Sequence, residues 1–123
     1  MRVFTHPDCL LHASPRGFPE SPARLRGILD RLRSDGFGVT ECGDHPHVDE
    51  AVRETHEERY VDRFRAAVER GDGLLDSADN PLSSGTWTSA RAAVSAVLTA
   101  VDWTAGGAGR RSVAAVRPPR HPA

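Results

Sequence analysis

The sequence predicts an α/β fold in which helices cover both faces of a parallel sheet. Segments with the composition of short strands alternate with segments whose apolar residues recur at helical spacing, which is typical of this class. Stretches rich in glycine, proline and serine separate these segments. The length of 123 residues corresponds to one domain, so we assign residues 1–123 to a single domain.

The first half of the chain predicts two short strands with a helix between them. Residues 2–5 are β-prone, and Pro7 ends the run. Ser21 and Pro22 form a helix start, because serine caps a helix and proline fits its first turn. Leucine and isoleucine then recur at positions 25, 28, 29 and 32 until Gly36 stops the helix. Residues 39–42 are a candidate second strand.

The second half predicts two helices, a loop between them and a final strand. A charged helical segment begins at about Val48, and its apolar face runs from Tyr60 to Val68 before Gly71. Residues 71–85 are predicted to form a loop. The long helix that follows has an apolar face at positions 87, 90, 94, 97, 98 and 101. Residues 112–116 are the last strand candidate, which Pro118 and the next proline end.

The sequence stops soon after this last strand. Ligand sites in open α/β sheets lie just beyond the carboxyl ends of the strands, so we expect the sheet to be incomplete. The last strand would then leave an unpaired edge, and we expect this edge to allow self-association of the chain.

Composition argues against membrane and secreted classes. The chain contains no apolar run of about 18 residues and opens with no signal-peptide pattern. We therefore expect a cytoplasmic chain that spans no membrane, with Cys9 and Cys42 reduced.

All 16 basic residues are arginines, and they are unevenly distributed. Residues 81–123 contain five arginines and only Asp102 as an acid, whereas the first 80 residues are net acidic. This asymmetry leaves open a non-catalytic module that binds an acidic partner through its basic C-terminal half. We do not expect a nucleic-acid partner, because the arginines form no dense run and no aromatic residues interleave with them.

Five segments, in order along the chain, carry a family pattern. They are the opening strand with His6, the helix start 17–25, the segment 55–61, the loop 79–87 and the terminal segment 112–123. Together they resemble the bacterial histone-deacetylase-like amidohydrolases, zinc-dependent deacetylases that include acetylpolyamine amidohydrolases and acetoin-utilisation proteins. The resemblance implies the arginase/deacetylase-type parallel sheet with helices on both faces. It covers only about the N-terminal third of that domain, so the domain at residues 1–123 is expected to be partial.

The resemblance also implies an activity, the hydrolysis of acetyl-lysine or acetylpolyamine amides. In such enzymes zinc polarises the carbonyl and lowers the pKa of a bound water, and it needs three protein ligands and an open position. By resemblance, His121 is the first of two active-site histidines. Asp79 corresponds to the loop acid that accepts hydrogen bonds from the substrate backbone. Its place in a polar loop is equally typical of a turn or cap acid.

Departures from the family pattern predict that the isolated chain is inactive. Pro122 stands where the family has its second histidine, usually the base that takes the water proton, and proline has no titratable group. Arg120 replaces a glycine, and the family's zinc ligands and carbonyl-polarising tyrosine lie downstream of Ala123. We therefore expect a truncated, catalytically incomplete form with no metal, in which His121 is non-functional. A fragment that becomes active when another polypeptide completes it is an alternative.

One further segment could hold a metal. Cys42, Asp44, His45, His47 and Asp49 lie within eight residues, and a His-x-His pair in an extended loop can converge on zinc. A polar connecting loop explains the same residues, and this is our expectation.

Overall fold

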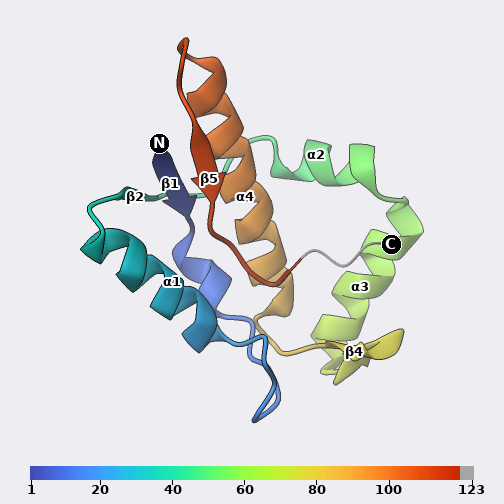
Figure 1. The fold of residues 1–123 in the computed structure, drawn as a ribbon. Helices are drawn as coiled ribbons and strands as arrows, with labels where there is room; N and C mark the ends of the chain where they lie inside the picture. Colours follow the sequence, from blue (N-terminus) through green and yellow to red (C-terminus); the bar gives the residue numbers. More distant parts are fainter. Residues whose placement is uncertain (120–123) are drawn as a thin grey trace.

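The computed structural model of the protein describes residues 1–119, and its centre is a parallel sheet of three strands (Figure 1). β1 (Arg2–Thr5) lies between β2 (Gly38–Glu41) and β5 (Ser112–Ala114), and both outer strands run parallel to it. The register places Val3 beside Val39 on one side and beside Val113 on the other. β1 is therefore the buried centre of the sheet, as a run of apolar residues in a parallel strand predicts.

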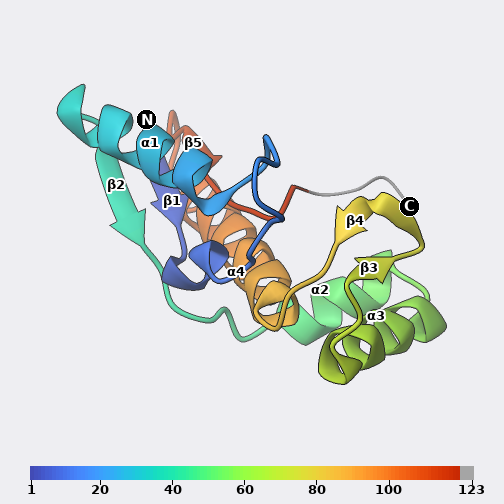
Figure 2. The same ribbon diagram turned by 90° about the horizontal axis from the view of Figure 1, so that it is seen from below.

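Helices cover both faces of this sheet, which confirms the predicted fold class (Figure 2). α1 (Pro22–Ser34) packs on one face, where its Leu25 and Leu29 belong to a buried cluster against which Val39 packs. α4 (Thr86–Ala105) packs on the other face, where the ring of Phe4 lies 5.9 Å from that of Trp103. Successive side chains of a strand point to opposite faces, so neighbouring residues of β1 contribute to the two layers.

The face of α4 that packs against the sheet differs from the predicted apolar face. Its buried side chains are small, chiefly alanines 92, 96 and 100, together with Ser89 and Ser95. Val97 and Val101 are exposed instead. Small side chains let the helix lie close to β1 and to the short 3-10 helix η1 (Pro7–Leu10), with Ser89 Oγ donating a 2.5 Å hydrogen bond to the carbonyl of Asp8. Periodicity alone does not distinguish such a small-residue face from a face of larger apolar residues.

The charged segment after β2 forms two helices where one was predicted. α2 (Val48–Thr55) and α3 (Glu58–Arg70) are separated by His56 and Glu57, whose backbones are extended. The end of α3 agrees with the prediction, because Gly71 has a φ of +79°, which glycine adopts at little cost. α4 lies between the sheet and this pair of helices (Figure 1), and the rings of Phe64 and Trp87 pack 5.5 Å apart.

The predicted loop at 71–85 contains a small hairpin. β3 (Leu74–Leu75) pairs antiparallel with β4 (Ser77–Pro81). Asp76, the residue between them, has a φ of +63°, a conformation that aspartate tolerates better than most residues. The hairpin was not predicted because its strands carry few β-branched residues.

Two observations concern the ends of the fold. β5 is shorter than predicted, although Ala115 N still donates to Phe4 O at 2.8 Å, and its Val113 side chain is exposed. Within residues 1–119, no strand pairs with the outer edge of β5.

No helix within residues 1–119 is long and apolar enough to cross a membrane.

Candidate functional site

A buried arginine holds the chain immediately after β5. The side chain of Arg117 is nearly inaccessible to solvent, and its Nε and Nη2 donate to the two carboxylate oxygens of Glu20 at 2.7 and 2.9 Å. Nη2 also donates to Ser14 Oγ, and Nη1 donates to the carbonyls of Cys9 and His12. A single guanidinium thus joins η1, the loop before α1 and the segment after β5, and the bidentate pairing fixes its plane.

The electrostatics of this cluster depend on the same ion pair. Burial alone would raise the pKa of Glu20, but the hydrogen bonds and charge of Arg117 outweigh it and hold that pKa below its ordinary value. Burial and the charge of Arg117 lower the pKa of His12, whose Nδ1 lies 2.8 Å from Thr86 Oγ1. At neutral pH the cluster therefore contains an ionised Glu20 and a neutral His12.

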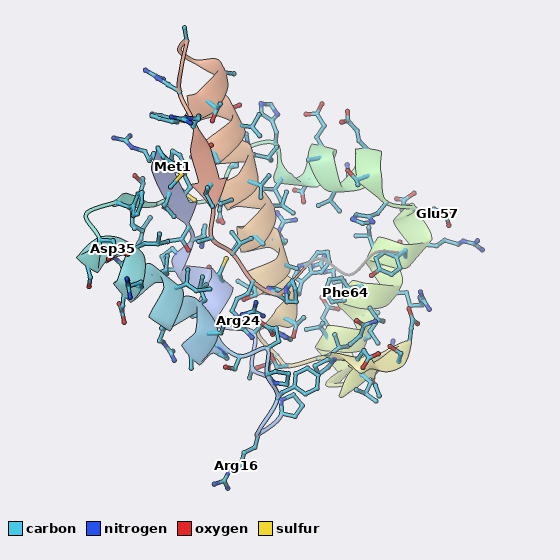
Figure 3. The ribbon with its side chains drawn as sticks, viewed as in Figure 1. Met1, Arg16, Arg24, Asp35, Glu57 and Phe64 are labelled. Carbon is cyan, nitrogen blue, oxygen red and sulfur yellow. The ribbon has the colours of Figure 1, made fainter. Side chains whose placement is uncertain are left out.

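Next to this cluster the structure has a cavity of about 510 Å³. α2, α3 and α4 form its mainly apolar walls, and Phe64 lies on the side of α3 that faces α4 (Figure 3). Polar groups come from the loop before α1 and from β4, and the segment after β5 closes the remaining side. The lining includes His12, Phe18, Glu20, Tyr60, Phe64, Asp79, Asn80, Trp87, Val94, Leu98, Pro118 and Pro119.

The structure places one predicted site residue at this cavity. Asp79 is exposed on β4 and lines the cavity. Within residues 1–119 its carboxylate has no hydrogen-bond or ion-pair partner, so it caps no turn or helix there. His121 and Pro122 lie outside the described residues. Pro118 and Pro119, at the end of the described chain, line the same cavity as Asp79.

The polar loop before α2 is held by pairwise contacts. His45 Nε2 lies 2.9 Å from Asp102 Oδ2, and His47 Nδ1 lies 3.1 Å from Glu50 Oε2. Asp44 instead faces His6, with 3.3 Å between Oδ1 and Nε2. In the described part of the chain no three histidine, cysteine, aspartate or glutamate side chains are placed to hold a metal ion. The two histidines of the His-x-His pair therefore each contact a different carboxylate.

Comparison with known proteins assigns the chain to a family. The profile of the family described as "Histone deacetylase domain" matches residues 18–123. The chain belongs to this family. The match includes the loop with Asp79 and the terminal segment with Arg117, which are two of the segments that carry the resemblance, whereas the opening strand with His6 lies outside it.

Two relatives show how much of a deacetylase-family protein the chain represents. A histone deacetylase-like amidohydrolase of Pseudomonas aeruginosa is 29% identical over 111 residues, which cover 84% of this chain and 27% of that protein. The crystal structure of the HDA15 HD domain has the same fold, with a TM-score of 0.77, at 21% identity over 96% of this chain and 35% of that one. The chain therefore spans between a quarter and about a third of the length of these relatives.

The sequence alone does not indicate the Arg117 cluster. Glu20 and Arg117 both lie in segments that carry the family resemblance, but 97 residues separate them. An arginine before two prolines and a glutamate before a helix are individually typical of exposed loops. Their pairing depends on β1 and β5 being neighbours in the sheet, which no local pattern shows.

Proposed function

We propose that this chain supplies the N-terminal part of a deacetylase-family catalytic domain that hydrolyses acetyl-lysine or acetylpolyamine amides. In this proposal the 123 residues alone are catalytically incomplete, and they act in a reducing cytoplasm with Cys9 and Cys42 as free thiols. Asp79 takes the role of binding the substrate backbone.

One observation supports the proposal above others. The loop acid Asp79 lines the same cavity as Pro118 and Pro119, which directly precede the segment that resembles the family's histidine motif. These groups are distant in sequence and lie on different elements, yet they border one space of about 510 Å³, which is within the usual range of ligand pockets. A carboxylate at the rim of an apolar space suits a substrate with amide N–H donors and an acyl chain.

The residues described do not fit the zinc ion that the family uses. Residues 1–119 contain no group of three suitable side chains, and the three-ligand site that zinc chemistry needs is not formed by them. Within this part of the chain we therefore assign roles in shaping the cavity and binding substrate, and none in activating water.

Substrate binding can be tested apart from catalysis. Trp87 lines the cavity whereas Trp103 lies against the sheet at Phe4, so a Trp103→Phe background leaves Trp87 as the fluorescent reporter. We expect titration with an acetyl-lysine peptide to change the Trp87 emission, and Asp79→Asn to weaken that binding several-fold.

The matched control is Asp62→Asn, which removes an exposed carboxylate of α3 that does not line the cavity. It should leave the binding unchanged. No emission change with either an acetyl-lysine peptide or an acetylpolyamine would contradict the assignment of this cavity. Equal weakening by the two variants would contradict the role of Asp79.

A further inference from the structure

The structure separates the arginines of the basic C-terminal half into two groups. Arg91 pairs with Asp49, and Arg117 pairs with Glu20. Arg110 and Arg111, by contrast, have no carboxylate partner among residues 1–119. Among the described residues of this half, the positive charge without a carboxylate partner therefore lies at the turn between α4 and β5.

The fold adds a further positive group from the start of the chain. Arg2 opens β1, and its backbone N donates to the carbonyl of Arg111 at 3.0 Å. The guanidinium carbons of Arg2 and Arg110 lie 5.2 and 5.0 Å from the ring centre of Trp103. We call the side chains of Arg2, Arg110 and Arg111 the arginine patch, which lies at the same end of the sheet as Met1 (Figure 3).

The Arg110 side chain is held in place by the turn that precedes it. Its Nη1 donates to the carbonyl of Trp103 at 3.1 Å, which satisfies one free carbonyl in the last turn of α4. A Cβ on Gly107 would meet Arg110 Nε at 2.7 Å, so the absence of a side chain there allows the guanidinium to lie back across the turn. A guanidinium has five N–H donors, so most of those on Arg110 remain available to a ligand.

Nearby acids do not neutralise the patch. Asp102 precedes Trp103 in α4, but its carboxylate lies 2.9 Å from His45 Nε2. Two other arginines that have no carboxylate partner in the described chain lie beside acidic residues in the sequence. Arg53 and Arg59 flank the stretch that contains Glu54, Glu57 and Glu58.

We propose that the arginine patch binds the phosphodiester backbone of a nucleic acid. Guanidinium groups match phosphate oxygens in a bidentate way, and arginines stacked on an aromatic ring form a platform on which bases also stack. A membrane surface would favour an amphipathic helix with an exposed apolar face, and this patch lies on strand ends and a glycine turn. The sequence alone led us to expect no nucleic-acid partner, because the arginines form no dense run and Arg2 is far from Arg110 and Arg111 along the chain. The proposal departs from that expectation because the fold brings these three arginines to one end of the sheet.

Binding can be measured by fluorescence anisotropy with a labelled oligodeoxythymidylate at low salt. Because the net charge of the chain is −1, binding of a polyanion requires a local positive surface. We expect the triple variant R2Q/R110Q/R111Q to lower the affinity at least tenfold. The slope of log affinity against log salt should also become shallower by about 0.7 for each phosphate that the variant no longer neutralises.

The matched control is R16Q/R53Q/R59Q, which removes the same charge from exposed arginines elsewhere, one of them at the tip of a projecting loop (Figure 3). It should bind like the unmodified chain. Gly107→Ala is a second variant that retains every charge but displaces Arg110, and it should weaken binding several-fold relative to Gly43→Ala, where a Cβ meets nothing within 4 Å. Circular dichroism establishes that each variant is folded.

Several results would overturn the proposal. They are no oligonucleotide binding at low salt, an equal loss of affinity in the two triple variants, or unchanged binding in Gly107→Ala. Binding to phosphatidylserine vesicles without binding to the oligonucleotide would identify a membrane surface and would equally refute it.

Discussion

Replacement of Arg117 by alanine is expected to lower the free energy of unfolding by about 3–5 kcal/mol, because it leaves the Glu20 carboxylate partly buried without its counter-charge. The Arg117 side chain is 3% exposed and that of Glu20 is 17% exposed, so little solvent screening reaches the pair. The loss is expected toward the lower end of that range, since Glu20 retains some contact with water. The carbonyls of Cys9 and His12 also lose a donor.

Urea unfolding followed by far-UV circular dichroism provides the measurement. Arg117→Lys keeps the charge but not the bidentate geometry, so its free energy of unfolding should lie between those of the alanine variant and the unmodified chain. Arg31→Ala is the matched control, because it breaks an exposed pair with Asp35 and should change the stability by less than about 0.5 kcal/mol. The double variant Arg117→Met, Glu20→Gln should lose less free energy of unfolding than the two single substitutions lose in total.

A loss below about 1 kcal/mol for Arg117→Ala, typical of an exposed ion pair, would refute this reasoning. It would mean that the segment after β5 is not anchored by this guanidinium in solution. The position of Pro118 and Pro119 at the cavity would then need another cause.

Three other predictions concern packing, pH and association. Gly85→Ala should cost about 1–3 kcal/mol in unfolding free energy, because its Cβ would lie 2.1 Å from a backbone oxygen, whereas Gly43→Ala meets nothing within 4 Å; urea unfolding of the two variants compares them. Stability should fall as the pH drops below about 6.5, because the depressed pKa of His12 means that the unfolded chain takes up the proton first. His12→Gln should flatten this part of the pH profile, and a profile as steep as that of the unmodified chain would contradict it. We also propose that the β5 edge mediates self-association, so Val113→Lys should shift the sedimentation profile toward monomer, whereas Val101→Lys on the exposed side of α4 should not.

The sequence predicts the order of elements well because each boundary has a local chemical cause. Ser21 and Pro22 start α1, Gly71 ends α3, and the β-prone runs at 2–5 and 112–116 became neighbouring parallel strands. The break at His56 was missed, because neither His56 nor Glu57 is a residue that stops helices. The hairpin around Asp76 was missed because its strands carry few β-branched residues and its turn depends on one residue with a positive φ.

The candidate site was predictable only in part. Asp79 was found through the family resemblance, and its lack of a partner in the described chain could not be known from its loop. The Arg117 cluster and the arginine patch both join residues that are far apart in the sequence. The order of the strands in the sheet brings these residues together, so the two clusters can be recognised only when the topology is known.

These 123 residues belong to the deacetylase family, and we propose that they do not form its catalytic centre alone. The most direct test is zinc content by elemental analysis together with an acetyl-lysine fluorogenic assay, both on the same purified, tag-free chain. We expect zinc far below one ion per chain and no hydrolysis above background. Stoichiometric zinc with turnover would contradict this proposal and would mean that this chain assembles a complete metal site of its own.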